Sequence, residues 1–423
     1  MQPFALNLKL LGGENMNKKL KVLSSVLTAL VLTTALAGCS SSKSSTSSTS
    51  TTTKKESKEI LIWTNYQGKD FVPIKKLAED WAKETGNTVK VVEDKVGLDS
   101  IIAASKSSKA PDVMIGYPND RLGSFVKADI VDEVPAGIMN DSDYIAPAIT
   151  GSMINGKKYG VPLTLETYVL FYNKDLVPTP PKTWEELMIV GKKVGFNYAL
   201  NDVYFSLALI KANGGYVFKD NNGTIDTNDI GLANAGAVKG LTMINDLVTS
   251  GIVAPSVTSD IAKGNFLNKK IGLYISGNWD VSAFKDKVNF GVATYPQIDG
   301  KAVPTTAGVK LAVVSKNSKV KATAWEFMKY VGAKAPYIIF KQTAAIPVLK
   351  ADQEKDEIKK DPITSVFAEQ AKSAAPMLSV PEFGTIWEPG KQNITLMITK
   401  KQTPQQAADN IVKQVKEGIA TMK

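Results

Sequence analysis

The sequence predicts an α/β protein whose folded part divides into two lobes. Between residues 60 and 115, short apolar runs alternate with amphipathic helical segments, which is typical of a parallel β-sheet covered by helices. The chain has 423 residues, and the 364 from Ile60 onward are more than one ordinary hydrophobic core accommodates. We therefore expect two lobes, each with its own core.

The first lobe is expected to begin with a strand, a helix and a second strand. Residues 60–63 are all apolar or aromatic, as in a buried strand. In the helix that follows, Pro73 suits the first turn and Gly86 marks the end. The apolar face of this helix consists of Ile74, Leu77, Ala78 and Trp81. Further along the chain we expect a strand at 88–92, a helix at 100–104 and a strand at 112–115.

The second half of the chain contains similar signals. Residues 168–172 have the composition of a strand. The spacing of Thr183 and Glu186 is that of a capping box, which places the start of a helix at Thr183. We also expect helices near 234–250, 322–332 and 404–421, and a strand at 271–275.

The first 59 residues have the features of an export leader and a tether. Lysines that follow Met16, the natural start, precede an apolar run at 22–37, and the leader ends in Leu-Ala-Gly-Cys39. This ending resembles the lipobox of bacterial lipoproteins, whose cysteine receives diacylglycerol and becomes the N-terminus after cleavage. The apolar run of 16 residues is shorter than the roughly 20 that a membrane-spanning helix needs. We therefore predict a lipoprotein signal peptide over 1–39, lipidation of Cys39 with palmitate among the acyl groups, and a disordered Ser/Thr-rich tether over 40–59.

The composition excludes several kinds of chemistry. The chain has no histidine, which excludes a histidine-containing catalytic triad and histidine metal ligands. Cys39 is the single cysteine, so the folded part has no disulfide and no cysteine-bound metal, and no cofactor is expected. Residues 1–39 have four lysines and one glutamate, and residues 40–59 have four lysines and two glutamates, so the net charge of +10 falls to +5 beyond them. The basic residues there are scattered, so nucleic acid is not an expected partner.

Arg121 is the one arginine among 51 basic residues. A lysine-biased composition explains the others, so this arginine indicates a position where a planar, forked hydrogen-bond donor is needed. An ordinary surface arginine is the alternative interpretation.

Short strings spread from Ile60 to the C-terminus form a combined pattern. The most specific is Leu-Phe-Tyr-Asn-Lys-Asp-Leu at 170–176, followed by Pro-Lys-Thr-Trp-Glu-Glu at 181–186. The other strings are Leu61-Ile62-Trp63, Pro111-Asp112-Val113, Asn119-Asp120-Arg121, Gly214-Gly215-Tyr216, Asn234-Ala235-Gly236-Ala237, Gly277-Asn278-Trp279 and the late Trp387. Together they resemble the maltose/maltodextrin-binding branch of extracellular solute-binding protein family 1, whose members serve ABC importers.

The resemblance implies a type II periplasmic-binding-protein fold. Two α/β lobes are joined by crossing strands, ligand binds in the cleft between them, and a hinge motion closes the cleft. The implied first lobe comprises residues 60–165 and 308–352, and the second comprises residues 166–307 and 353–423.

The resemblance also implies the binding residues. Carboxylates accept hydrogen bonds from pairs of sugar hydroxyls, arginine donates as a fork, and aromatic rings stack on the C–H faces of a sugar ring. On the side of the first lobe, the implied residues are Asp120, Arg121 and Glu166, with Tyr117 where the family has a tryptophan. On the side of the second lobe, they are Asp202, Tyr204, Trp279 and Trp387.

Each of these residues also has a purely structural interpretation. The Asp120–Arg121 pair could form a salt bridge within its loop, and Glu166 could be a solvated carboxylate at a strand end. Asp202 could cap a helix. The two aromatic side chains Tyr204 and Trp279 could belong to a hydrophobic core.

Trp387 is the strongest of the candidates. Gly384, Pro389 and Gly390 surround it with loop signals, so a core position is less compatible with its neighbours. The remaining tryptophans fall on apolar strand or helix faces and are assigned to the structure: Trp63, Trp81, Trp184 and Trp325.

The chain departs from the maltose-binding pattern in places. Residues 65–70 read Asn-Tyr-Gln-Gly-Lys-Asp where the family's first loop has an adjacent Asp-Lys pair that contacts sugar. Glu388 stands where the family has an aromatic residue, and Lys391 stands in place of an arginine. These differences leave the length and the end preference of the sugar open, so a linear maltodextrin or a cyclodextrin agrees with the sequence as well as maltose does.

The function implied by the resemblance is that of a lipid-anchored substrate-binding component of an ABC importer. Such a protein is a monomer at the extracellular face of the cell membrane that binds maltose or maltodextrins reversibly and delivers them to the importer's membrane subunits. One alternative is a binder of another solute: a different oligosaccharide, a peptide or a polyamine. A second is a glycan-active enzyme with two carboxylates, drawn from Asp120, Glu166 and Asp202, at the bond that is cleaved.

Overall fold

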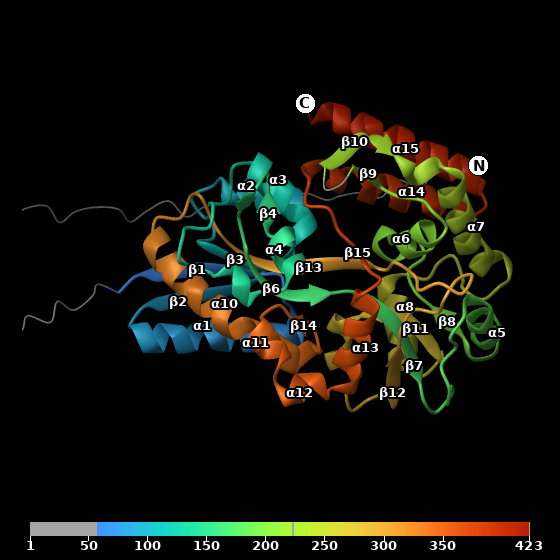
Figure 1. The fold of residues 1–423 in the computed structure, drawn as a ribbon, viewed down its shortest axis with the longest axis horizontal. Helices are drawn as coiled ribbons and strands as arrows, with labels where there is room; N and C mark the ends of the chain where they lie inside the picture. The colour runs from blue at the N-terminus through green and yellow to red at the C-terminus, as the bar shows by residue number, and fades with distance from the viewer. Residues whose placement is uncertain (1–56, 222–223, 423) are drawn as a thin grey trace, which may run out of the picture. The chain divides into compact units, whose positions relative to one another are not determined.

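The computed structural model describes residues 57–221 and 224–422. The predicted signal peptide, the lipidated Cys39 and most of the predicted tether lie outside the described residues. At the end of that predicted tether, strand β1 (Glu59–Thr64) already begins at Glu59. Two main β-sheets organise the described chain, and helices pack on the faces of both (Figure 1).

The first sheet has seven strands in the order β14-β6-β13-β3-β1-β2, with β15 paired to β13. Its other strands are β2 (Thr88–Glu93), β3 (Val113–Pro118), β6 (Val161–Glu166), β13 (Thr306–Val314), β14 (Ile346–Pro347) and β15 (Ala375–Pro376). Strand β1 pairs in parallel with both β2 and β3, which confirms the strand–helix alternation for this segment. Strand β13, which lies outside the segment of this prediction, is antiparallel to β3 and to β6, so the complete sheet is mixed.

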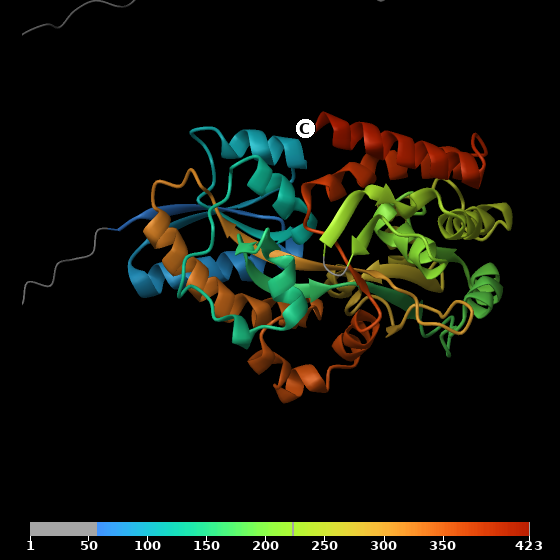
Figure 2. The ribbon, with the colours of Figure 1, turned by 45° about the horizontal axis from the view of Figure 1, so that its top comes forward.

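One face of the first sheet is covered by α1 (Phe71–Thr85) and α10 (Lys321–Thr343), which pack on each other (Figure 2). The predicted apolar face of α1 is buried there, and Gly86 ends the helix in the left-handed conformation at φ 72°. Helix α10 runs on beyond the predicted 322–332, because Ala335 and Ile339 continue its contact with the same core. The opposite face carries α2 (Leu98–Ser105), α3 (Leu122–Lys127) and α4 (Ala146–Gly151).

The second sheet has four strands in the order β12-β7-β11-β8. They are β7 (Tyr168–Asn173), β8 (Phe196–Asn197), β11 (Leu273–Gly277) and β12 (Phe290–Ala293). The helices grouped around it and its hydrophobic core are α5 (Trp184–Val194), α6 (Val203–Ala212), α7 (Ala235–Thr249), α8 (Ser259–Leu267), α13 (Pro362–Ala371), α14 (Trp387–Ile398) and α15 (Pro404–Thr421). The predicted strands at 168–172 and 271–275 and the predicted helices at 234–250 and 404–421 are therefore present, with small shifts of their ends.

Short elements complete the chain. A separate hairpin consists of β9 (Phe218–Asn221) and β10 (Thr224–Ile230), and a second small hairpin of β4 (Met153–Ile154) and β5 (Lys157–Lys158). Short helical segments of three to six residues are η1 (Gly68–Asp70), η2 (Asn119–Arg121), η3 (Asp141–Asp143), η4 (Gly231–Ala233), η5 (Asn278–Asp280), η6 (Pro381–Ile386), α9 (Val281–Phe284), α11 (Lys350–Gln353) and α12 (Asp356–Lys359).

Thr183 caps α5 as predicted, but the capping box is shifted by one residue. The Thr183 hydroxyl accepts a hydrogen bond from the backbone N–H of Glu186. The Glu186 carboxylate accepts from the N–H of Lys182, at 2.7 Å, and not from that of Thr183. Two backbone donors near the helix start are still satisfied, which is what stabilises this end of the helix.

The chain passes from the first sheet to the second at Glu166–Tyr168 and returns where β13 begins. The hydroxyl of Thr167 lies 2.8 Å from that of Thr305 and donates to the carbonyl of Thr306 at 3.0 Å. The N–H of Thr306 in turn donates to the Tyr168 hydroxyl at 3.2 Å. These side-chain bonds tie the two crossing segments together. No helix in the described ranges is both long and apolar enough to cross a bilayer.

Candidate functional site

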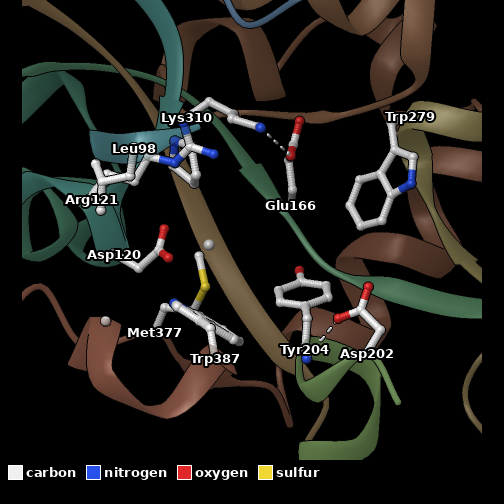
Figure 3. A pocket seen from close by; sticks show the side chains of 13 residues that line it. Leu98, Asp120, Arg121, Glu166, Asp202, Tyr204, Trp279, Lys310, Met377 and Trp387 are labelled. Atoms are coloured by element: carbon white, nitrogen blue, oxygen red, sulfur yellow. Dashed lines mark hydrogen bonds and ion pairs between the residues drawn. The ribbon is translucent and has the colours of Figure 1, made fainter. Parts of the chain in front are cut away.

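A cavity of about 460 Å³ lies beside these crossing segments (Figure 3). It is lined by Leu98, Pro118, Asp120, Arg121, Glu166, Asp202, Tyr204, Trp279, Gly308, Lys310, Met377, Gly384 and Trp387. Every predicted binding residue except Tyr117 is in this lining. The structure therefore brings together side chains from widely separated parts of the sequence.

Strand pairing in the first sheet places one side of the cavity. Asp120 and Arg121 lie in η2, directly after the end of β3, and Glu166 is the last residue of β6. Strand β13 runs between β3 and β6, and its register puts Gly308 opposite Glu166 and Lys310 opposite Pro118. The charged side chains of this wall consequently meet at one edge of the sheet.

Asp202 lines the cavity and caps a helix at the same time. It is the N-cap of α6, and its carboxylate accepts from the N–H of Tyr204 at 3.0 Å. Asp202 therefore caps a helix, as its structural interpretation predicted, and it also lines the cavity. Two residues further on, the Tyr204 hydroxyl donates to the carbonyl of Thr306 at 3.1 Å, which fixes the ring relative to the crossing segment.

Trp387 does not lie in a loop, as its neighbours led us to expect, but is the first residue of α14. Pro389 is the third residue of this helix, where a missing N–H breaks no intrahelical hydrogen bond. Gly390 allows α14 to approach α6, since a Cβ atom there would lie 2.4 Å from Cγ2 of Val203. The glycine and proline therefore serve helix packing and a helix start, not a loop.

Three aromatic side chains face the cavity across from its cations. Figure 3 shows Tyr204, Trp279 and Trp387 on one side and Arg121 and Lys310 on the other. The rings of Tyr204 and Trp279 are 6.0 Å apart, and Trp387 meets Phe383 edge to face at 5.3 Å. All three cavity aromatics are only partly buried, so part of each ring is available to a ligand.

The two neighbours Asp120 and Arg121 carry buried polar atoms that lack a partner. Oδ1 of Asp120 and Nη1 of Arg121 are buried and have no hydrogen bond within the described protein. Such atoms are uncommon because each costs about 1–3 kcal/mol when it is left unpaired. Because Asp120 and Arg121 also line the cavity, this unpartnered donor and acceptor beside it indicate a place for ligand hydroxyl groups.

Burial raises the pKa values of the carboxyl groups in the site. It brings the pKa of Asp120 to about 6, against the opposing influence of the charges of Arg121 and Lys310 and of the nearby Trp387 indole. Burial also raises the pKa of Glu166, which Lys310 opposes, and that of Asp202, which the N–H of Tyr204 opposes. Desolvation of the carboxyl group is the main cause of the raised pKa in all three.

Lys310 was not predicted from the sequence. Its Nζ lies 3.7 Å from Oε2 of Glu166, and its side chain is 20% exposed. Nothing local distinguishes it from the other lysines, and β13 itself was not expected. Only the pairing of β13 with β3 and β6, which are distant in the sequence, brings Lys310 into the cavity.

Tyr117, in contrast, is placed outside the cavity. It is 1% exposed, its hydroxyl donates to the carboxylate of Asp94, and its ring packs against Phe125. The guanidinium of Arg121 lies 5.8 Å from the centre of the ring. The structure thus puts Tyr117 in the core behind Arg121 and outside the lining of the cavity.

The positions that depart from the family pattern lie around the cavity and not in its lining. Asp70 turns toward α9 and accepts from the Ser282 hydroxyl at 3.1 Å. Glu388 is exposed and pairs with Gln392 at 2.8 Å. Lys391 is also exposed, and its charge opposes the rise in the pKa of Asp202.

A second cavity of about 730 Å³ lies near the hairpin β9–β10 and the segment 371–381. Met377 lines both cavities. The second lining is mostly aliphatic and contains none of the predicted binding residues, so the smaller cavity is the candidate site. Among the described residues, no group of three or more carboxylate side chains is arranged to hold a metal ion.

Two α/β sheets joined by crossing segments, with a polar and aromatic cavity beside those segments, define a solute-binding protein. The family model of the bacterial extracellular solute-binding proteins matches residues 76–366, and the chain belongs to this family. Its fold is that of the periplasmic solute-binding proteins.

Relatives with assigned ligands are similar over most of the chain. A maltodextrin-binding protein of Bacillus subtilis is 31% identical, with 93% of this chain and 97% of the relative covered. A maltooligosaccharide ABC transporter solute-binding lipoprotein of Streptococcus pneumoniae is 28% identical, with 93% and 96% covered. Among solved structures, the maltose-maltodextrin binding protein of Alicyclobacillus acidocaldarius has a TM-score of 0.81 and 35% identity, with 85% of this chain and 100% of that chain covered.

Proposed function

We propose that this protein is the substrate-binding component of an ABC importer and that it binds maltodextrin-type oligosaccharides reversibly. The observation that carries the proposal is the unpaired Asp120 Oδ1 and Arg121 Nη1 in a cavity whose other side is formed by aromatic rings. Sugars present hydroxyl groups at the ring edge and C–H groups on the ring faces, and this cavity offers a match to both. The names of the relatives in Bacillus and Streptococcus support an α-glucan and a transporter partner.

We further propose that the two sheets belong to two lobes, 60–165 with 308–352 and 166–307 with 353–423, that close around the sugar. In support of this division, β6 of the first sheet ends at Glu166 and β7 of the second begins at Tyr168. The cavity is lined by residues of both proposed lobes, so their approach would bring donors, acceptors and rings onto one ligand. Closure by a hinge is a standard motion for such an arrangement.

The proposal places the protein outside the cell as a monomer held by lipid on Cys39. The Leu-Ala-Gly-Cys39 ending supports this anchor, as does the streptococcal relative, which is named a lipoprotein. Metabolic labelling with a clickable fatty acid, compared between the wild type and Cys39→Ser, tests the anchor. Equal label in both proteins would contradict it.

Calorimetric titration of the purified protein tests the ligand. Maltose, maltotriose, maltotetraose and a cyclodextrin are compared with galactose-containing and other unrelated oligosaccharides. A micromolar dissociation constant, which corresponds to about −8 kcal/mol, is expected for at least one α-glucan. Binding of only an unrelated sugar would overturn the α-glucan assignment, and no binding of any sugar would overturn the proposal.

An incubation of the protein with sugar, followed by chromatography, separates a binding protein from an enzyme. After long incubation with maltotetraose, we expect the sugar to be recovered at its original length, since the family consists of solute-binding proteins. Shortened chains detected by chromatography would favour the carboxylate-pair enzyme instead.

A further inference from the structure

Lys310 is the charged residue of the cavity for which the proposed function gives no role. It lies on β13, and the register of this strand places it beside the ends of β3 and β6. Its ammonium points toward Glu166, at 3.7 Å, from the same side of the cavity as Arg121 (Figure 3). The Glu166 side chain is 8% exposed, so this ion pair is largely shielded from water.

The ionised state of Glu166 depends on Lys310 more than the ionised state of Asp120 does. A buried carboxylate loses hydration and is kept ionised only by nearby opposite charge or by donors. Around Asp120, both Arg121 and Lys310 supply positive charge, and the nearby Trp387 indole also favours the ionised form. Around Glu166, Lys310 is the cation that acts on the carboxyl group, and the nearby Asn278 amide also favours the ionised form.

The other titratable groups near Glu166 do not replace Lys310. The carboxylate of Asp70 disfavours a second negative charge at Glu166. Tyr66 and Tyr204 also lie close enough to feel the charge of Glu166, and burial raises the pKa of both phenols, so neither provides a positive charge. Without Lys310, an ionised Glu166 would face one like charge and only neutral donors.

We propose that Lys310 sets the lower pH limit of sugar binding, because it keeps Glu166, and together with Arg121 also Asp120, ionised as acceptors for sugar hydroxyls. This inference rests on the proposed function. It makes Lys310 a positioning residue that acts through the carboxylates and determines the pH range in which the cavity takes up sugar.

The direction of the effect follows from linkage. A sugar hydroxyl that donates to a carboxylate favours the ionised form, so affinity falls as the pH drops through the pKa of that carboxyl group. Each coupled proton lowers the affinity by at most tenfold for each pH unit. Removal of Lys310 raises the pKa of Glu166, so the fall in affinity begins at higher pH.

The test compares the wild type with Lys310→Met and Lys310→Arg by calorimetry with the best α-glucan from pH 4.5 to 8. We expect the acid midpoint of the affinity to move up by about one pH unit in Lys310→Met, as for loss of an opposite charge within roughly 4–6 Å. Lys310→Arg keeps the charge and the wild-type midpoint. Lys321→Met is the matched control, since Lys321 pairs with Asp132 at 2.7 Å, is 41% exposed and does not line the cavity.

A second measurement does not require sugar. The titration of the Glu166 carboxyl carbon is followed by NMR in 13C-glutamate-labelled protein, with Glu166→Gln to assign the signal. Its midpoint should rise in Lys310→Met and stay unchanged in Lys321→Met. Lys310→Gln removes the same charge and is measured in the same way if Lys310→Met does not fold.

The outcomes separate the inference from the proposed function. If the wild type binds an α-glucan and its acid midpoint equals that of Lys310→Met, the inference is overturned and the proposed function stands. An unchanged Glu166 midpoint in the NMR titration also overturns the inference. If the wild type binds no sugar at any pH, the proposed function fails, and with it the role of Lys310 in binding.

Discussion

Replacement of Arg121 by lysine keeps the positive charge of the site and removes the planar, forked hydrogen-bond donor of the guanidinium. Nη1 of Arg121 is buried without a partner, so the guanidinium already presents a desolvated donor to the cavity. A hydrogen bond from a charged group contributes about 1.5–3 kcal/mol, and about 1.4 kcal/mol corresponds to a tenfold change in affinity. We therefore expect Arg121→Lys to weaken α-glucan binding by roughly tenfold to a hundredfold.

The same substitution should leave the fold unchanged. Because Nη1 makes no hydrogen bond within the described part of the protein, its loss removes no such contact of the fold. Calorimetry gives the affinity and thermal unfolding without sugar gives the stability, and Arg121→Met separates the loss of charge from the loss of the fork. Wild-type affinity in Arg121→Lys would refute the reasoning that the planar donor is needed at this position.

Three further predictions concern the rest of the site and its support. Trp387→Ala should weaken binding by about 1 kcal/mol or more through the loss of ring stacking, whereas Trp387→Phe should weaken it less; equal titrations for all three proteins would contradict a stacking role. Gly390→Ala should lower the free energy of unfolding by about 1–3 kcal/mol, since its Cβ would lie 2.4 Å from a side chain of α6. Urea unfolding measures both this variant and the control Gly264→Ala, which lies in α8 with open space around it and should be neutral or stabilising. Because burial raises the pKa of Asp120 to about 6 from 3.8, its contribution to stability is largest below about pH 4 and declines as the pH rises to about 6. Asp120→Asn should therefore gain stability relative to the wild type over this interval, and a constant difference would argue against the raised pKa.

Local signals in the sequence were sufficient for the elements that depend on neighbouring residues. The buried face of α1 and its end at Gly86 follow from spacing and from one glycine, and both are observed. The cap at Thr183 follows from its hydroxyl, although the partner of Glu186 is one residue away from the expected position. These features need information from only a few consecutive residues, which is why sequence reasoning reaches them.

The pairing of strands that are distant in the sequence could not be predicted from such local signals. The direction of β13 in the first sheet depends on strands well over a hundred residues earlier, and the place of Lys310 in the cavity depends on that pairing. Tyr117 shows the opposite case: this aromatic residue next to a predicted binding loop is buried in the core, where its hydroxyl donates to the carboxylate of Asp94. Sequence motifs therefore located most of the candidate site, whereas the sheet register decided which nearby side chains belong to it.

The balance of charges in the cavity bears on the class of solute. The carboxyl groups of Asp120, Glu166 and Asp202 are accompanied by the cations of Arg121 and Lys310, so neither sign dominates. A polyamine would meet two like charges, and an anionic sugar would meet three. A neutral, polyhydroxylated ligand meets acceptors and donors without a net charge to overcome, and it can use the partly exposed rings of Tyr204, Trp279 and Trp387 for its apolar faces. We therefore expect titrations with spermidine and with a uronic-acid oligosaccharide to show no binding under conditions in which the neutral α-glucan binds.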